Sequence, residues 1–167
     1  KRYVHAPVFM GPPNAREGTG AMLVSGEKSR YEALLPTLET MTGRVVYLGE
    51  EPGRAAAFKR FGNLVIISSV GLLGDVNRLA RGLGIPTADA MGFFQGFNPG
   101  LLLPARAAKL GEGDFTASFE LAMARKDVRL MLEEASRHGA ELLVVPGVAA
   151  MLDAALARGD GASDMVA

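Results

Sequence analysis

Hydrophobic and polar positions follow a strand-like pattern near the start of the chain. Between Glu27 and Met41 the apolar residues take helical spacing, which predicts an amphipathic helix that Ser25 or Gly26 could cap. Short runs bounded by glycine or proline and rich in β-branched residues predict strands at Tyr3 to Val8, Gly20 to Ser25 and Arg44 to Leu48. A small α+β part is therefore expected over residues 1–50.

The pattern changes near residue 50, and residues 51–167 read as an all-helical part. Helical spacing from Gly53 to Arg81 predicts one unusually long helix, ended by glycines before Pro86. The apolar run Leu142 to Val145 is compatible with one more short strand. Shorter helices are predicted at Thr87 to Gln95, Pro99 to Lys109, Ala117 to Arg137 and Pro146 to Ala157. The expected fold is mainly α, with a small α+β N-terminal part.

A lysine lies on the apolar side of the long predicted helix. At about 100° per residue, Lys59 and Asn63 fall on one narrow strip, which Ile66, Val70 and Asn77 continue. The residues around Lys59 are mostly apolar, so we expect a buried helix and a desolvated ammonium, which exchanges its proton more readily near neutral pH. A solvated pair on a helix surface is the more common meaning of a Lys–Asn spacing, and it is the alternative interpretation.

Three further features are less specific. Ala6 to Pro13 is a strand that ends in a loop rich in glycine and proline, where free backbone N–H groups can hold a carboxylate, although an ordinary turn has the same composition. Arg125, Lys126 and Asp127 form a charged triplet that is usually the solvated face of a helix. Gly62, inside the long helix, is readable as a packing glycine.

Composition excludes several classes of protein. The chain is 49% hydrophobic and carries 18 residues of each charge, which predicts a globular protein without a nucleic-acid surface. It has no cysteine, and its two histidines, His5 and His138, are far apart, so no disulfide and no metal site are expected. The apolar run Leu64 to Leu73 is shorter than the roughly 20 residues of a membrane span. We therefore expect a cytoplasmic protein without a membrane partner.

Taken in order, several segments resemble the β-hydroxyacid dehydrogenase family, which includes 3-hydroxyisobutyrate dehydrogenase-like and 6-phosphogluconate dehydrogenase-like enzymes. The catalytic motif of that family is a glycine, a lysine six residues later and an asparagine four beyond. The matching residues are Ala6 to Gly11 with Gly18, then Gly53, Lys59 and Asn63, then Gly82 to Pro86, and finally Gly113 to Phe115 with Phe119, Leu121, Lys126 and Asp127.

The resemblance implies an NAD- or NADP-dependent oxidoreductase. Residues 1–50 would be the last strands of a Rossmann-type domain, and residues 51–167 a helical catalytic and dimerisation domain. A glycine-rich dinucleotide fingerprint does not occur in this sequence, so the resemblance places most of the cofactor site N-terminal to Lys1. The implied partners are a small hydroxy-acid or aldehyde substrate and a second copy of the chain.

The resemblance also implies roles for individual residues. Lys59 would exchange the proton on the substrate oxygen, and Asn63 would orient the substrate. Lys126 and Gly53 would lie beside the cofactor, with Asp127 fixing the helix of Lys126. The substrate carboxylate would be bound by the loop of Phe9, Met10 and Gly11.

The substrate loop departs from the family pattern. The family commonly has Ser-Gly-Gly after Pro-Val, whereas this chain has Phe9, Met10 and Gly11, which predicts a larger or less polar substrate. Relatives that reduce imines usually replace the catalytic lysine, so retention of Lys59 favours carbonyl or alcohol chemistry. The alternative function is a non-catalytic helical module, derived from such an enzyme, that dimerises or binds a partner.

Overall fold

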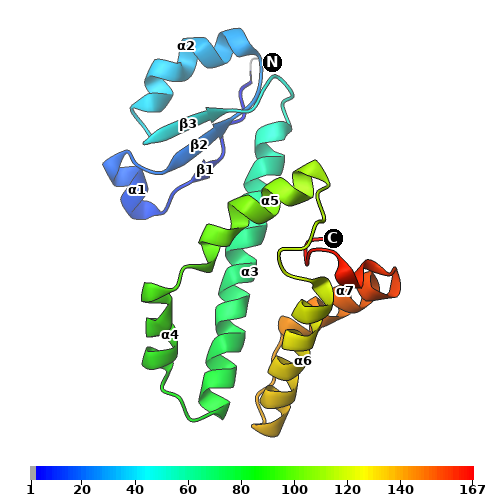
Figure 1. Ribbon diagram of the computed structural model, residues 1–167. Coiled ribbons are helices and arrows are strands. Elements are labelled where there is room, and N and C mark those ends of the chain that lie inside the picture. The colour runs from blue at the N-terminus through cyan, green and yellow to red at the C-terminus, as the bar shows by residue number, and fades with distance from the viewer. Residues whose placement is uncertain (1–2) are drawn as a thin grey trace. The chain divides into compact units, whose positions relative to one another are not determined.

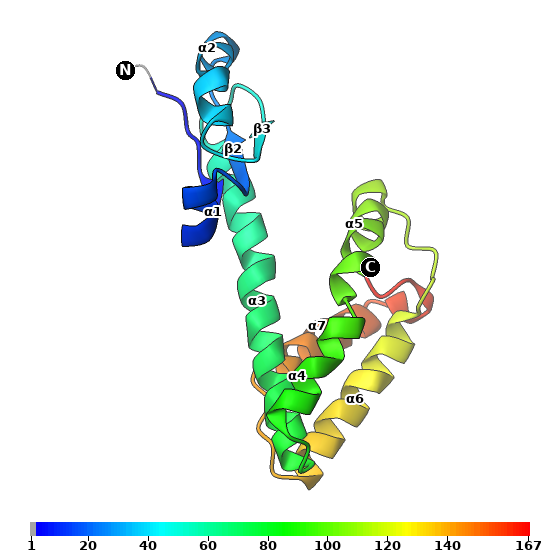
Figure 2. The same cartoon turned by 90° about the vertical axis from the view of Figure 1, so that its left-hand side faces the viewer.

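The computed structural model describes residues 3–167. The chain forms two compact units, Lys1–Ser68 and Ser69–Ala167, and the division falls inside the long helix α3 (Arg54–Gly82). All three strands lie in the first unit, and the second unit is helical (Figures 1 and 2). The expectation of a mainly helical chain with a small α+β N-terminal part is confirmed.

A three-stranded sheet forms the centre of the first unit. Its order is β1 (Val8–Phe9), β2 (Ala21–Val24), β3 (Arg44–Tyr47); β1 is antiparallel to β2, and β2 is parallel to β3. Parallel neighbours need a crossover connection, and α2 (Lys28–Glu39) provides it. A stacked pair of rings, Tyr31 on α2 and Tyr47 on β3, has centroids 4.3 Å apart. Because β2 is central and apolar, its residues from Met22 onward are the buried part of this sheet.

The N-terminal segment differs from its prediction in three places. Only Val8 of the predicted strand Tyr3 to Val8 lies in β1, although His5 also forms an isolated bridge with Ser25. The glycine- and proline-rich loop contains a short helix, α1 (Pro12–Glu17), because proline is favoured in the first turn, where its missing N–H costs nothing. Neither Ser25 nor Gly26 caps α2, whose N-cap is Glu27.

Ser25 instead links the sheet to α3. Its hydroxyl is fully buried, donates to the carbonyl of Pro52 over 3.0 Å and accepts the N–H of Ala55 over 3.1 Å. Ala55 is in the first turn of α3, where backbone N–H groups lack partners within the helix. This contact fixes the start of α3 against the end of β2, and Lys59 follows one turn later.

The second unit contains the remaining helices. They confirm the predicted helical segments, with ends that shift by a few residues and a 3₁₀ turn at the start of the segment predicted from Pro99 to Lys109. Their bounds are α4 Thr87–Gly96, η1 Pro99–Leu102, α5 Leu103–Glu112, α6 Leu121–Arg137, α7 Val145–Ala157 and η2 Asp160–Ala162.

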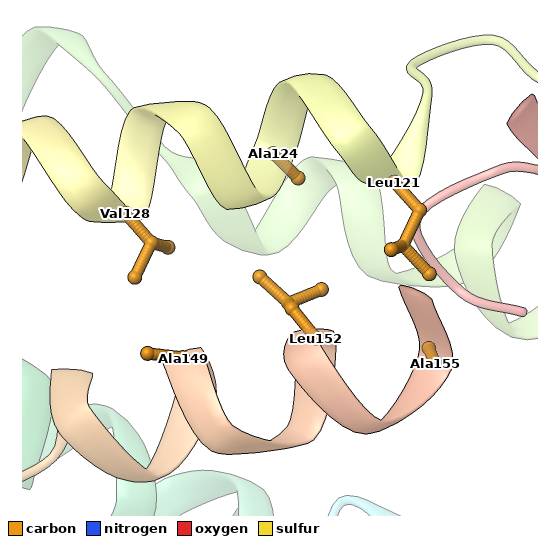
Figure 3. Close-up of a cluster of buried hydrophobic side chains, with 6 residues drawn as sticks. All are labelled: Leu121, Ala124, Val128, Ala149, Leu152 and Ala155. Carbon is orange, nitrogen blue, oxygen red and sulfur yellow. The ribbon is translucent and has the colours of Figure 1, made fainter. Parts of the chain in front are cut away.

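The core of the second unit lies between α6 and α7. On α6 the apolar face is buried at Leu121, Val128 and Ala135, and Leu132 is partly buried against the same cluster. Alanines on both helices let the backbones approach, and Leu152 of α7 fills the space between them (Figure 3). The cluster comprises Leu121, Ala124, Val128, Ala149, Leu152 and Ala155.

The strand considered at Leu142 to Val145 is wrong. Asp75 of α3, which is 3% exposed, accepts the backbone N–H groups of Leu143, Val144 and Val145 over 2.8, 2.8 and 3.0 Å. Val145 is the first residue of α7, and the other two immediately precede it, so the carboxylate lies at the N-terminus of that helix, where backbone N–H groups lack partners within the helix. These N–H groups are therefore occupied by a side chain, and no sheet partner is needed.

The apolar stretch of α3 is more exposed than its sequence predicts. Ile67 is 68% exposed, and none of the residues in the most apolar window is buried within residues 3–167. The expectation of a buried helix is therefore wrong for this chain. That window has a mean hydropathy of 1.3, so by length and composition α3 also meets the test for a membrane span. Core helices of soluble proteins meet the same test.

Candidate active site

Lys59, Asn63 and the aromatic ring of Phe9 lie together in the first unit. The Nζ atom of Lys59 is 3.9 Å from the centroid of the Phe9 ring, which is cation–π distance. Asn63 follows Lys59 by one helical turn on the same side of α3. All three side chains are half-buried, so the ammonium is shielded on one side and open on another. The predicted desolvation of Lys59 is therefore only partial.

Gly62 allows this close approach between the loop and the helix. A Cβ atom at residue 62 would lie 2.3 Å from Cζ and 2.7 Å from Cε1 of Phe9. No side chain fits there while the ring keeps its place. Gly62 is therefore a packing glycine, as the sequence suggested, and the group that packs against it is the Phe9 ring.

Apart from the cation–π contact of Lys59 with Phe9, the side-chain polar groups of Lys59 and Asn63 have no partner among the described residues. Across residues 3–167 Lys59 forms no ion pair, and the side-chain amide of Asn63 makes no hydrogen bond with another described residue. A hydrogen-bonding group held in place but left without a protein partner is available to a ligand. Both groups are suited to contacting one oxygen atom of a small molecule.

The loop after β1 is held in place by backbone contacts. Phe9 pairs with Ala21 across the sheet. Gly20 has φ of +90°, and a Cβ there would lie 2.8 Å from the carbonyl oxygen of Phe9 and 2.9 Å from the side chain of Met10. The N–H of Gly11 donates to Oδ1 of Asn14 over 2.9 Å. That donor is thus already used, and Phe9 and Met10 are the loop residues left to face a ligand.

The two residues predicted to lie near a cofactor, Gly53 and Lys126, belong to different units of the chain. Gly53 is exposed just before α3, with no heavy atom within 4 Å of where a Cβ would stand. Lys126 belongs to the second unit, on α6, where its ammonium pairs with Asp127 at 2.9 Å and both side chains are 43% exposed. Each is accessible to solvent. The contacts around Lys59 involve neither of them.

Sequence reasoning missed Gly20 and the true role of Ser25. Gly20 opens a predicted strand, and nothing local distinguishes it from an ordinary strand boundary. The sequence suggests Ser25 only as a cap of α2, yet its partners Pro52 and Ala55 lie 27 and 30 residues away. A serine buried at the end of an apolar strand is the one signal that would have favoured a long-range contact.

Two family models match this chain. One, described as NAD-binding of NADP-dependent 3-hydroxyisobutyrate dehydrogenase, matches residues 53–167, and the other, the NAD binding domain of 6-phosphogluconate dehydrogenase, matches residues 1–49. The first alone spans more than half of the sequence. The chain belongs to the β-hydroxyacid dehydrogenase family. NAD(P) is the cofactor of this family.

Curated β-hydroxyacid dehydrogenase relatives match at low identity. The 2-hydroxy-3-oxopropionate reductase of Escherichia coli is 24% identical over 134 residues, which cover 80% of this chain and 46% of that protein. Glyoxylate/succinic semialdehyde reductase 1 of Arabidopsis thaliana is 25% identical over 134 residues, covering 78% of this chain and 45% of that protein. The chain thus spans about half the length of these relatives.

Solved structures share the β-hydroxyacid dehydrogenase fold. An imine reductase from Myxococcus stipitatus in complex with NADP⁺ aligns with a TM-score of 0.88 at 17% identity, covering 98% of this chain and 59% of that one. This likeness concerns the fold alone.

Proposed function

We propose that this chain is the C-terminal part of an NAD(P)-dependent oxidoreductase that interconverts a small 3-hydroxy acid and its semialdehyde or keto form. The reaction is a hydride transfer in which Lys59 acts as general acid and base. The observation that carries the proposal is the position of Lys59 and Asn63, one helical turn apart on α3, with Lys59 against Phe9 of β1. Among residues 3–167 neither side chain makes an ion pair or a side-chain hydrogen bond. Family membership supports the reaction class.

The proton moves at Nζ of Lys59. In oxidation, the neutral amine takes the proton of the substrate hydroxyl; in reduction, the ammonium returns a proton to the carbonyl oxygen. A nicotinamide, when bound, would supply or accept the hydride. Asn63, one turn along, donates its amide N–H to the same oxygen and keeps it within reach of Nζ.

This chain offers only two residues, Gly53 and Lys126, that could each contact the cofactor. Gly53 leaves an uncovered stretch of backbone, and the Lys126 ammonium can exchange its exposed partner Asp127 for a group of the cofactor. The sequence has no glycine-rich loop between a strand and a helix. We therefore assign the dinucleotide site mostly to residues outside this chain, and expect residues 1–167 alone to be inactive.

The substrate lies against the loop after β1. Phe9 and Met10 present apolar surface where the family commonly carries a serine hydroxyl, which favours a substrate with an apolar group near its reacting carbon. Gly11 shapes the loop, because its own N–H is committed to Asn14. Retention of Lys59 favours a carbonyl or alcohol over an imine as the reacting group.

The test compares two neighbouring cations in the protein that joins this chain to its dinucleotide-binding half. Lys59→Ala is expected to lower kcat for oxidation of small 3-hydroxy acids by roughly 100- to 10,000-fold. Arg60→Ala is the matched control, because Arg60 is exposed on the same turn and has no proposed role. Undiminished activity in Lys59→Ala, with the melting temperature unchanged, would overturn the role of Lys59.

A second copy of the chain is the proposed partner. Leu64, Ile67 and Val70 of α3 are 68%, 68% and 64% exposed, and exposed apolar side chains in such density are typical of an interface. The same observation favours the alternative function, a non-catalytic helical module that only dimerises. Sedimentation at micromolar concentration tests both: self-association that Ile67→Glu abolishes is expected, and a monomeric wild-type protein would contradict both.

Activity separates the two functions. An enzyme requires NAD(P) turnover that depends on Lys59, whereas a module requires only self-association. If Ile67→Glu abolishes self-association and Lys59→Ala changes nothing measurable, the module is the correct description.

A further inference from the structure

We propose that Phe9 and Gly62 are a positioning pair that holds the ammonium of Lys59 in place through a cation–π contact. The proposal rests on the proposed role of Lys59 as the proton-transferring group. It assigns a function to Gly62, and it gives Phe9 a second function besides contacting the substrate. Neither residue exchanges a proton itself.

The backbone fixes the root of the Phe9 side chain. Phe9 is the last residue of β1 and pairs with Ala21 of β2. Gly20, the residue just before β2, has φ of +90°, and a Cβ there would lie 2.8 Å from the carbonyl oxygen of Phe9. The loop can lie this close to β2 only because residue 20 is glycine. The ring is thereby directed from the sheet toward α3.

The missing side chain of Gly62 leaves the space that the Phe9 ring occupies. Gly62 lies three residues after Lys59, so both are on one side of the helix. A Cβ at residue 62 would stand 2.3 Å from the ring, well inside van der Waals contact. A glycine inside a helix costs about 1 kcal/mol relative to alanine. That cost is explained here by the ring it admits, which then reaches Nζ of Lys59 at 3.9 Å.

An aromatic face suits a proton-transferring lysine better than a carboxylate does. The negative face of the ring attracts the cation, yet it takes up none of the ammonium hydrogens in a strong hydrogen bond. Those hydrogens remain free for the substrate oxygen and for Asn63. Lys59 has no ion pair with any residue from 3 to 167, so the ring is its positioning contact in the described chain.

The geometry is tested on this chain without any catalytic assay. In NMR spectra of protein labelled with ¹³C at lysine Cε, the Lys59 signal, assigned by its loss in Lys59→Arg, should be shifted upfield by the ring. Phe9→Leu and Gly62→Ala should each abolish that shift. Phe58→Leu is the matched control, because Phe58 is the adjacent aromatic residue but contacts Arg54. An unshifted Lys59 signal in the wild-type protein would overturn the proposal.

A double-mutant cycle independently tests the packing of the Phe9 ring against Gly62. Gly62→Ala should lower the melting temperature when Phe9 is present, because the new methyl group meets the ring. In the Phe9→Ala background the same change should raise it, because only the helix propensity of alanine remains. Equal effects of Gly62→Ala in both backgrounds would show that Gly62 does not receive the ring.

The functional arm uses the protein that carries the dinucleotide-binding half. Replacing Phe9 with phenylalanines bearing one, two or three ring fluorines keeps its shape while weakening the cation–π contact stepwise. The kcat should fall progressively, by roughly 3- to 30-fold across the series, with KM for the cofactor unchanged. A flat series in a protein whose activity does depend on Lys59 overturns the positioning pair alone. Activity that does not depend on Lys59 instead overturns the proposed function.

Discussion

Asp164 accepts two hydrogen bonds from Ser118, one from its backbone N–H and one from its hydroxyl, each over 2.8 Å. The carboxylate is fully buried, and it also pairs with Arg106 of α5 and accepts the N–H of Val166. One side chain near the C-terminus therefore joins α5, the segment before α6 and the last residues of the chain. Asp164 therefore holds the C-terminal residues in place against the rest of the second unit.

Asp164→Asn is expected to lower the melting temperature by on the order of 5 °C. An amide has one accepting oxygen instead of two and points N–H groups at the donors of Ser118 or Arg106, so some of these buried donors lose their partners. Asp160→Asn is the matched control, because Asp160 lies in the same segment but pairs with an exposed Arg158. Thermal unfolding followed by circular dichroism measures both, and equal small shifts would contradict the assigned role.

Stability should fall in acid because two buried carboxyl groups have lowered pKa values. Hydrogen bonds from Ser118, against an opposing effect of burial, hold the pKa of Asp164 well below its ordinary value. Burial alone raises the pKa of Asp75, but the N–H groups of Leu143, Val145 and Val144 together lower it.

The sign of the pH dependence follows from these directions. Both groups bind fewer protons in the folded state, so their stabilisation is complete above the ordinary value of 3.8 and is lost as pH falls through the folded pKa values. Urea unfolding at pH 7, 4 and 3 should show a free energy of unfolding that declines below pH 4. The double variant Asp75→Asn with Asp164→Asn should decline less steeply, and an equal slope would contradict the prediction.

Asp75→Ala should lower the free energy of unfolding of the helical unit by on the order of 3 kcal/mol, because it leaves the first N–H groups of α7 without a partner. Arg78→Ala is the control. Arg78 pairs with Asp75 at 3.4 Å but is 43% exposed, and exposed pairs contribute little. Denaturant titration of both variants distinguishes capping of α7 by Asp75 from a contribution of its ion pair.

Gly20→Ala should disturb the loop of Phe9, whereas Gly49→Ala should not. Both glycines have positive φ, of +90° and +102°, so both substitutions carry a backbone strain of about 1–2 kcal/mol. Only at Gly20 would the new methyl group also meet the carbonyl of Phe9, at 2.8 Å, while nothing lies within 4 Å at Gly49. We expect Gly20→Ala to shift the NMR signals of Phe9 and Lys59 and to lose more stability than Gly49→Ala.

Lys126→Ala should raise KM for NAD(P) by about tenfold in the protein with its dinucleotide-binding half, as loss of one exposed charged contact would. Its neighbour Arg125 gives the control. Arg125 makes a two-pronged pair with Asp153 of α7, at 2.6 and 3.0 Å, and should affect stability but not KM when changed to alanine. Steady-state kinetics separates the two, and an unchanged KM in Lys126→Ala would remove it from the cofactor site.

Much of the helical architecture could be predicted because it is encoded locally. The helical spacing of Leu121, Val128, Leu132 and Ala135 predicted the inner face of α6; three of these residues are buried and Leu132 is partly buried. The same kind of signal failed at Leu142 to Val145, where an apolar run resembled a strand. Its N–H groups donate to the carboxylate of Asp75, which is 68 to 70 residues earlier in the chain. No local sequence pattern reveals a partner at that distance.

In the candidate site, too, the sequence predicts the local relationships and only the tertiary structure shows the distant ones. The sequence by itself determined that Lys59 and Asn63 share one side of a helix, because four residues make about one helical turn wherever a helix forms. Only the tertiary structure decided that Phe9 covers Lys59 and that Gly62 admits its ring. Phe9 is 50 residues from Lys59, and the two meet because strand pairing at Ala21 and the buried hydroxyl of Ser25 fix β1 and α3 to the same sheet.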